Sequence, residues 1–259
     1  MIEVHNLTFG YSATEDGQIL KGVDFAAKTG KLTALIGTNG AGKSTLLKTI
    51  MGILKGKGEI SVNGKPVSQY STKDFSRTVS YLSQDNDCKV NLSVFEVVML
   101  GRMGSMSFRV SDEDIAATQE VLERLNLQRF ASRSIMELSG GQRQLVFMAQ
   151  ALVKEPKILI LDEPTSALDL HKQFDLLTLL KNLTQENDFT TLVTLHHLDL
   201  AAMFADEIIV LKEGTVYAQG APKDIFTEAM MEDVYRVKTK IYMDDNGLPH
   251  VIPLEAIIN

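Results

Sequence analysis

The sequence predicts an α/β fold that is built on a parallel sheet and interrupted by a mainly helical insertion. Short, continuous apolar runs at 32–36, 157–161 and 191–195 stand beside segments with helical spacing. Continuous runs of this length are typical of parallel strands that are buried on both faces of a sheet. The middle of the chain, about 87–150, is mainly helical in its pattern. This arrangement favours an α/β core with an inserted helical lobe.

The first elements follow from turn residues and apolar spacing. Strand patterns at 2–4 and 20–27 are separated by glycine-containing turns. After the apolar run at 32–36, residues 43–51 have helical spacing, and 56–66 has the pattern of a glycine-punctuated hairpin. We therefore expect short strands, then a strand–helix pair, then a hairpin.

Helix starts in the middle and a hairpin near the end complete the pattern. Ser93 with Glu96, and the run 111–114, carry the capping signals of helix N-termini. Residues 207–218 have the pattern of a closing hairpin, and the tail from 223 that of a helix followed by irregular strand.

The composition is that of a chain with a globular core, and it excludes several classes of protein. The 259 residues contain 26 Lys and Arg against 33 Asp and Glu, a formal net charge of −7, which argues against general nucleic-acid binding. With 44% hydrophobic residues, a largely disordered chain is excluded. The single cysteine, Cys88, excludes an intrachain disulfide and a cysteine-rich metal site. The start lacks the pattern of a secretory signal, and no apolar run approaches about 18 residues, so we expect no membrane span.

A glycine-rich loop between the first apolar run and its helix has the spacing of a phosphate-binding loop. Residues 37–44 match G-x-x-x-x-G-K-[ST] in the strand–loop–helix context that this motif requires. Backbone N–H groups and the helix N-terminus would bind phosphate oxygens, Lys43 would reach the β- and γ-phosphates, and Ser44 would coordinate Mg²⁺. The alternative is a glycine-rich turn before a helix. The predicted nucleotide-binding residues are Gly37, Asn39, Gly40, Ala41, Gly42, Lys43, Ser44 and Thr45.

Two carboxylates follow the apolar run 157–161. Asp162 and Glu163 would lie at the carboxyl end of a strand, the edge that faces the ligand crevice in open α/β sheets. Asp162 would hold Mg²⁺ directly or through water, and Glu163 would polarise the attacking water. The alternative is an exposed strand end that carries ordinary acids.

Residues 138–142, Leu-Ser-Gly-Gly-Gln, precede a predicted helix at 143–153 and form a second candidate anion site. A helix start with a serine and two glycines offers exposed N–H donors and one hydroxyl. One nucleotide does not easily contact two anion sites on different lobes, so the second site needs an explanation. The candidate residues are Ser139, Gly140, Gly141 and Gln142.

These three motifs, in this order, resemble the Walker A, signature and Walker B motifs of ATP-binding cassette (ABC) ATPases. The resemblance covers essentially the whole chain as one ABC ATPase domain, 1–259. It implies a P-loop NTPase (RecA-like) core with an antiparallel β subdomain, formed by 1–86 and 151–259, and an inserted α-helical subdomain at about 87–150. In this family two copies pair head to tail, so that the signature motif of one closes over the ATP of the other. The implied ligands are ATP and Mg²⁺.

The resemblance also assigns roles to smaller motifs. Tyr11 is similar to the aromatic residue that stacks on adenine, with a core tyrosine as the alternative. Gln84 resembles the Q-loop glutamine that contacts Mg²⁺ or water, with a surface glutamine as the alternative. Asp169 resembles part of the D-loop at the dimer interface, and its alternative is a helix cap. His196 resembles the switch histidine that senses the γ-phosphate, and His197 is the alternative residue for that role.

Further strings resemble one branch of the family. Residues 141–152 and 91–98 are similar to type II importer ATPases for iron chelates, haem and vitamin B12. This implies a peripheral subunit at the cytoplasmic face of a bacterial or archaeal membrane. Its partners would be a separate permease dimer and, indirectly, an extracytoplasmic substrate-binding protein, with no nucleic acid. The alternative is a soluble ABC ATPase of iron–sulfur cluster assembly.

The segment after Gln84, about 85–108, is expected to form the groove that receives a permease helix. Its apolar residues, Met99, Met103, Met106 and Phe108, are adaptable groups that suit such a groove. The alternative is that they are ordinary core and loop residues.

Overall fold

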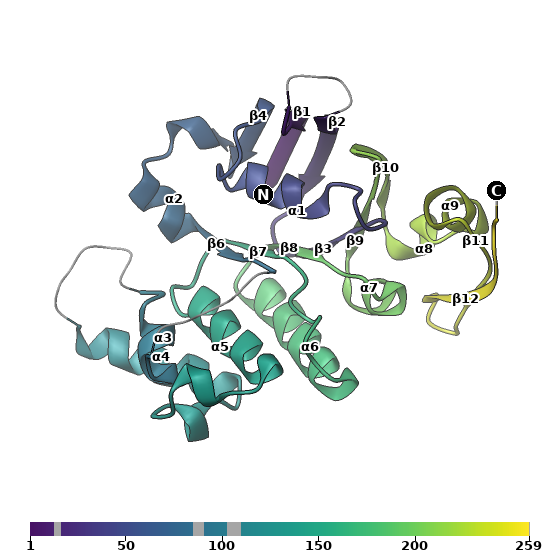
Figure 1. The fold of residues 1–259 in the computed structure, drawn as a ribbon. Helices are drawn as coiled ribbons and strands as arrows, with labels where there is room; N and C mark the ends of the chain where they lie inside the picture. The colour runs from purple at the N-terminus through teal and green to yellow at the C-terminus, as the bar shows by residue number, and fades with distance from the viewer. Residues whose placement is uncertain (13–16, 85–90, 103–109, 259) are drawn as a thin grey trace. The chain divides into compact units, whose positions relative to one another are not determined.

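The structure is a computed structural model that describes residues 1–12, 17–84, 91–102 and 110–258 (Figure 1). The chain divides into two compact units, Met1–Gln69 with Leu177–Asn259, and Tyr70–Leu176. The second unit is wider than the helical insertion expected at about 87–150, whose boundaries stay a prediction. Within the described residues, every helix is too short or too polar to cross a membrane.

The first unit contains a four-stranded antiparallel sheet of order β2-β1-β4-β5. Ile2 pairs with Ala27 on one side and with Val62 on the other, and the apolar side chains of β1 and β2 that alternate along the strands are buried. The predicted hairpin at 56–66 is confirmed. The strands are β1 (Ile2–Gly10), β2 (Gln18–Ala27), β4 (Lys57–Val62) and β5 (Lys65–Pro66).

The same unit contains strands in the order β10-β9-β3-β8. β3 is parallel to β8 and β9, and every residue of Leu32–Ile36 is fully buried, which confirms a parallel strand covered on both faces. The predicted closing hairpin is confirmed as β9–β10. The elements are β3 (Lys31–Ile36), α1 (Lys43–Ile50), β8 (Thr190–Thr194), α7 (Leu198–Phe204), β9 (Glu207–Lys212) and β10 (Thr215–Gly220).

The C-terminal segment is more regular than the sequence suggested. The expected irregular strand is a two-stranded antiparallel hairpin, because a turn closed by Gly247 N–H donating to Asp244 O (2.9 Å) sets the register Met243–Pro249. A short π-helix precedes the hairpin. The elements are α8 (Pro222–Ile225), α9 (Glu228–Met230), the π-helix η6 (Met231–Tyr235), β11 (Val237–Met243) and β12 (Pro249–Ala256).

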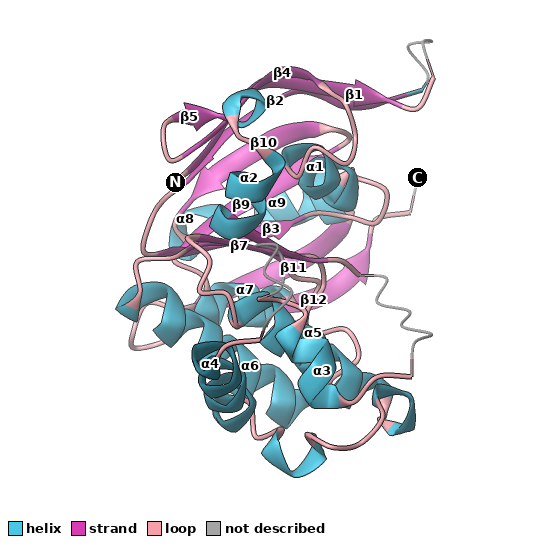
Figure 2. Ribbon diagram, turned by 90° about the vertical axis from the view of Figure 1, so that its left-hand side faces the viewer, coloured by secondary structure: helices cyan, strands magenta, loops and turns pink. Residues whose placement is uncertain are grey.

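The second unit combines a parallel strand pair with helices. β6 and β7 pair in parallel, so their carboxyl ends lie at the same edge. Figure 2 draws α3, α4 and α5 as a helical group, and these helices contact one another. The predicted capping box at Ser93 and the helix start predicted at 111–114 are confirmed, and Ser111 also forms a capping box, with Asp114. The elements are α2 (Thr72–Thr78), β6 (Val79–Leu82), α3 (Val94–Met99), α4 (Asp112–Arg124), α5 (Gly140–Leu152), β7 (Ile158–Leu161) and the start of α6 (Leu170–Glu186).

Candidate active site

The glycine-rich loop at 37–44 has a backbone that only particular glycines can adopt. Gly37 leaves β3 with φ +147°, and a Cβ at this position would lie 2.2 Å from the carbonyl oxygen of Leu211. Gly42, with φ +103°, is the N-cap of α1. An L side chain at Gly37 would be excluded by both its dihedral angle and its contact. Two glycines of the motif therefore shape the loop that precedes α1.

The start of α1 fits an anion. Within the described residues, α1 has no side-chain cap hydrogen bond and no acidic residue in its first turn, and a helix N-terminus of this kind favours an anion. Lys43 is buried, and its Nζ donates to the carbonyl oxygens of Gly37 (2.7 Å) and Thr38 (3.0 Å). The lysine side chain thus lies along the loop, where it is predicted to bind the phosphates of a nucleotide. The structure gathers the predicted residues from Gly37 to Thr45 in one loop and helix start.

Asp162 and Glu163 lie where the sequence predicts them, at the carboxyl end of β7. Asp162 is 1% exposed, and its N–H donates to Leu82 O at the end of the neighbouring strand β6 (2.9 Å). Glu163 has φ +51°, the left-handed region, which costs a non-glycine residue about 1–3 kcal/mol and is common at functional sites. The backbone therefore turns sharply at the predicted catalytic carboxylate.

Gln84 and Glu163 meet directly. Gln84 Nε2 donates to Glu163 Oε2 at 2.8 Å. Both residues follow parallel strands, β6 and β7, whose carboxyl ends share one edge. Gln84 is exposed, as the surface-glutamine alternative expects, and its Q-loop role stays a prediction.

Sequence reasoning missed two buried glutamines that donate hydrogen bonds to the backbone that follows β7. Buried Gln144 on α5 donates from Nε2 to Glu163 O (3.2 Å), so it supports the left-handed turn. Buried Gln173 on α6 donates to the carbonyl oxygens of Thr165 and Leu168 (3.1 Å each). A buried amide must find such partners. The available signal was a glutamine within an apolar helical stripe.

Residues 139–142 form the helix start that the sequence predicts. Ser139 is the N-cap of α5 in a capping box with Gln142, so its hydroxyl already accepts the Gln142 N–H (3.4 Å). A Cβ at Gly140 would meet open space, whereas at Gly141 it would lie 2.8 Å from Ala167 O. The first glycine leaves the helix end open, and the second allows the loop at 166–169 to approach.

Asp169 is a helix cap. Its Oδ1 accepts the Lys172 N–H (3.0 Å), and its Oδ2 pairs with Lys172 Nζ (2.8 Å). The hydrogen bond from the Lys172 side chain, followed by that from its N–H, lowers the pKa of Asp169. The alternative reading of Asp169 as a cap is confirmed, and its D-loop role at a dimer interface stays a prediction.

Tyr11 and the two histidines belong to the first unit. Tyr11 is 69% exposed and contacts the Phe9 ring edge-on, with ring centroids 5.0 Å apart. The core-tyrosine alternative is wrong, and an exposed ring suits stacking on a base. His196 and His197 are both exposed and follow Leu195, the first residue after β8, and His197 is the N-cap of α7. The choice of switch histidine stays a prediction.

The candidate Mg²⁺ ligands belong to both units. Gln84 and Asp162 of the second unit and Ser44 of the first each offer an oxygen atom, the ligand type that a hard cation prefers. The described part of the chain contains no group of three His, Cys, Asp or Glu side chains that could hold a metal by themselves. Mg²⁺ is commonly bound by one or two carboxylates and substrate phosphates, and Ser44, Gln84 and Asp162 as its ligands stay a prediction.

The fold and these motifs define an ABC ATPase, and comparisons with known proteins agree. The sequence pattern of the ABC transporter family matches residues 20–166. The chain belongs to this family, and it is an ATPase with the P-loop NTPase fold.

Particular relatives confirm the resemblance to the iron-chelate branch. The iron(3+)-hydroxamate import ATP-binding protein FhuC of Bacillus subtilis (strain 168) is 37% identical over 246 residues, 94% of this chain and 90% of FhuC. A metal-chelate type ABC transporter in an inward-facing conformation has a TM-score of 0.83 and 29% identity, over 98% of this chain and 97% of that chain. The ATP-binding cassette MJ0796, dimeric and bound to ADP and Pi, has a TM-score of 0.77 and 29% identity, over 86% of this chain and 99% of that chain.

Proposed function

We propose that this chain is the ATP-hydrolysing subunit of an importer that takes up a metal chelate of the iron–siderophore, haem or cobalamin type. The main support is the similarity, over nearly the whole chain, to a protein named for iron(3+)-hydroxamate import. The chain acts at the cytoplasmic face of a bacterial or archaeal membrane on a separate permease dimer. An extracytoplasmic binding protein delivers the substrate to this permease.

The proposed chemistry distributes roles among the residues above. Phosphoryl transfer depends on positioning and charge stabilisation more than on covalent chemistry. Lys43 and the loop N–H groups bind the phosphates, while Glu163 and His196 orient the attacking water. Ser44, Gln84 and Asp162 hold Mg²⁺, which neutralises phosphate charge when bound.

A second copy completes the site. Its Ser139 and Gly141 would close over the nucleotide in a head-to-tail dimer, which explains why one chain carries two anion sites. The dimeric state of the related cassette MJ0796 supports this pairing. The monomer is therefore a poor ATPase.

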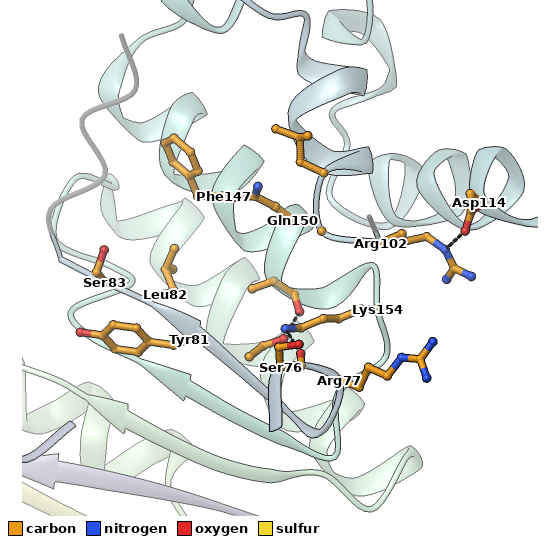
Figure 3. Close-up of a pocket in the computed structure, with 14 residues that line it drawn as sticks. Ser76, Arg77, Tyr81, Leu82, Ser83, Arg102, Asp114, Phe147, Gln150 and Lys154 are labelled. Atoms are coloured by element: carbon orange, nitrogen blue, oxygen red, sulfur yellow. Dashed lines mark hydrogen bonds and ion pairs between the residues drawn. The ribbon is translucent and has the colours of Figure 1, made fainter. Parts of the chain in front are cut away.

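A cavity of about 460 Å³ in the second unit is a candidate permease site (Figure 3). Three basic side chains and one carboxylate, Asp114, line the cavity. The pKa of Asp114 is lowered to about 2, mainly by a hydrogen bond from Arg102 (2.6 Å). Lys154 Nζ donates to Val79 O (3.0 Å), and burial lowers the pKa of this lysine. The excess of positive charge suits a permease helix with an acidic end. The third basic residue is Arg77, which is exposed.

The cavity corresponds only in part to the groove predicted at 85–108. Leu100, Gly101 and Arg102 line it. Met99 is buried in α3, so the core alternative is confirmed for this residue. Met103, Met106 and Phe108 lie outside the described residues. The strand β6 lines the cavity with Tyr81 and Leu82 and then leads to Gln84 at the Glu163 carboxylate, which offers a route between permease and active site.

The substrate class can be tested by uptake. In cells that make the protein, we expect Lys43→Ala to abolish accumulation of one of three labelled compounds: an iron(III) siderophore, haem or cobalamin. The variant loses the charge that binds the phosphates, so transport loses its energy source. An exposed lysine, Lys73→Ala, is the matched control. Unchanged uptake of all three compounds would contradict the proposal and favour the alternative, an ABC ATPase of iron–sulfur cluster assembly.

A further inference from the structure

The carbonyl oxygen of Glu163 accepts hydrogen bonds from two parts of the second unit. One part is the turn itself, where Ser166 donates from its N–H (3.3 Å) and from its hydroxyl (3.0 Å). The other part is α5, where buried Gln144 donates from Nε2 (3.2 Å), across 19 residues of sequence. The bonds from Ser166 are local, whereas the bond from Gln144 joins the turn to a different element.

α5 contacts the backbone that follows β7 at two positions on one face. Gly141 and Gln144 are three residues apart, so they lie on the same side of the helix. A Cβ at Gly141 would lie 2.8 Å from Ala167 O, so the backbone at this residue approaches the helix start closely. Gln144 lies about one turn further along the helix and binds the Glu163 carbonyl. The helix that begins at the second candidate anion site therefore also holds the turn at Glu163.

Glu163 is held at both ends of the residue. Its carboxylate accepts Nε2 of Gln84 (2.8 Å), and its carbonyl oxygen accepts Nε2 of Gln144. The backbone between these bonds has φ +51°, a conformation that persists in a non-glycine residue only where the surrounding structure holds it. A rotation of this backbone would move the carboxylate, and a displacement of about 1 Å in a reacting group can cost ~10²-fold in rate.

We propose that Gln144 is a positioning residue for ATP hydrolysis. Through the carbonyl oxygen of Glu163, it sets the direction of the carboxylate that orients the attacking water. Gln144 acts through Glu163 and does not touch the nucleotide. The inference rests on the proposed role of Glu163 and is independent of the transport proposal.

The test removes the amide donor with Gln144→Met, because methionine is unbranched and adaptable but has no N–H to donate. We expect kcat to fall about three- to tenfold, which corresponds to one neutral hydrogen bond whose loss is felt in the transition state. KM and the Kd for ATP should stay at their wild-type values, because the phosphate contacts are unchanged. Phosphate release is measured at a protein concentration where turnover per chain no longer rises, and an ATP-binding titration gives the Kd.

The matched control is Thr118→Val on α4 of the same unit. Thr118 is fully buried, and its hydroxyl donates to Asp114 O (2.7 Å), so the substitution also removes a hydrogen bond of a buried side chain. We expect Thr118→Val to lower Tm and to keep the wild-type kcat. A wild-type kcat for Gln144→Met would overturn the inference, and so would an equal fall in kcat for Thr118→Val.

A double variant gives a readout that a merely structural role would not produce. Because Gln144 acts through the Glu163 carboxylate, Gln144→Met combined with Glu163→Gln should hydrolyse ATP in a single turnover within about twofold of Glu163→Gln alone. A further fall of about three- to tenfold in the double variant would overturn the inference, since the two residues would then act independently.

Two further comparisons separate the possible failures. If Gln144→Met does not fold, Gln144→Asn decides, because its amide is one methylene too short to reach the Glu163 carbonyl. A lower kcat with unchanged KM in this variant supports the inference, and a wild-type kcat overturns it. If Glu163→Gln hydrolyses ATP at the wild-type rate, the role of Glu163 fails and the inference fails with it, whereas a slow Glu163→Gln beside an unchanged Gln144→Met overturns the inference alone.

Discussion

Glu163→Gln should bind ATP with wild-type affinity and hydrolyse it at least ~10²-fold more slowly, the lower end of the effect of a lost general base. Glutamine keeps the size of the side chain but cannot take a proton from water. The Gln84 contact, now between two amides, can persist with the glutamine oxygen as acceptor. Steady-state phosphate release and a separate ATP-binding titration measure the two expectations.

The chain offers a matched control for this substitution. Glu155 is exposed and shares the left-handed backbone of Glu163, with φ +51° for both residues. Glu155→Gln makes the same chemical change in the same backbone conformation, away from the carboxyl end of β7, and should hydrolyse ATP at the wild-type rate. Turnover of Glu163→Gln near that of Glu155→Gln would remove Glu163 from the proposed mechanism.

Gly37→Ala should lower the free energy of unfolding by about 3 kcal/mol or more, from a dihedral angle nearly restricted to glycine and an overpacked contact. The added methyl group would meet Leu211 O at 2.2 Å, and this oxygen belongs to the backbone of β9, which cannot move cheaply. Denaturant unfolding gives the loss when the midpoint concentration and the slope of the transition are compared between variants.

Gly64→Ala separates the two causes. Gly64 has φ +74°, and an added Cβ would meet no atom within 4 Å, so only the dihedral cost of about 1–2 kcal/mol is expected. A loss for Gly37→Ala no larger than that for Gly64→Ala would show that the contact with Leu211 does not constrain the loop.

The sequence predicted the motifs and most of their local structure because these features are short-range. The phosphate loop, the helix start after Ser139 and the apolar β7 ahead of Asp162 each depend on neighbouring residues. The contact between Gln84 and Glu163 was not predicted, because it depends on the pairing of β6 with β7.

Features that depend on contacts between residues distant in the sequence could not be predicted from it. No sequence signal marks the left-handed backbone of Glu163, because an acidic residue rarely adopts this conformation. The turn is supported by Gln144, which lies on α5 and is distant in the sequence. The regular pairing of β11 with β12 was not predicted, and in the structure β12 exposes apolar side chains such as Ile252 and Leu254, so it lacks a simple alternating pattern.

The central claim is that the chain hydrolyses ATP on behalf of a separate membrane permease. The most direct test is affinity purification of the tagged chain from detergent-solubilised membranes of the cells that make it, followed by mass spectrometry. We expect a polytopic membrane protein at one-to-one stoichiometry. Arg77→Glu, in the candidate permease cavity, should lose this protein with ATP binding intact, while Lys73→Glu on the same helix should retain it. A set of soluble assembly proteins without a polytopic partner would contradict the claim.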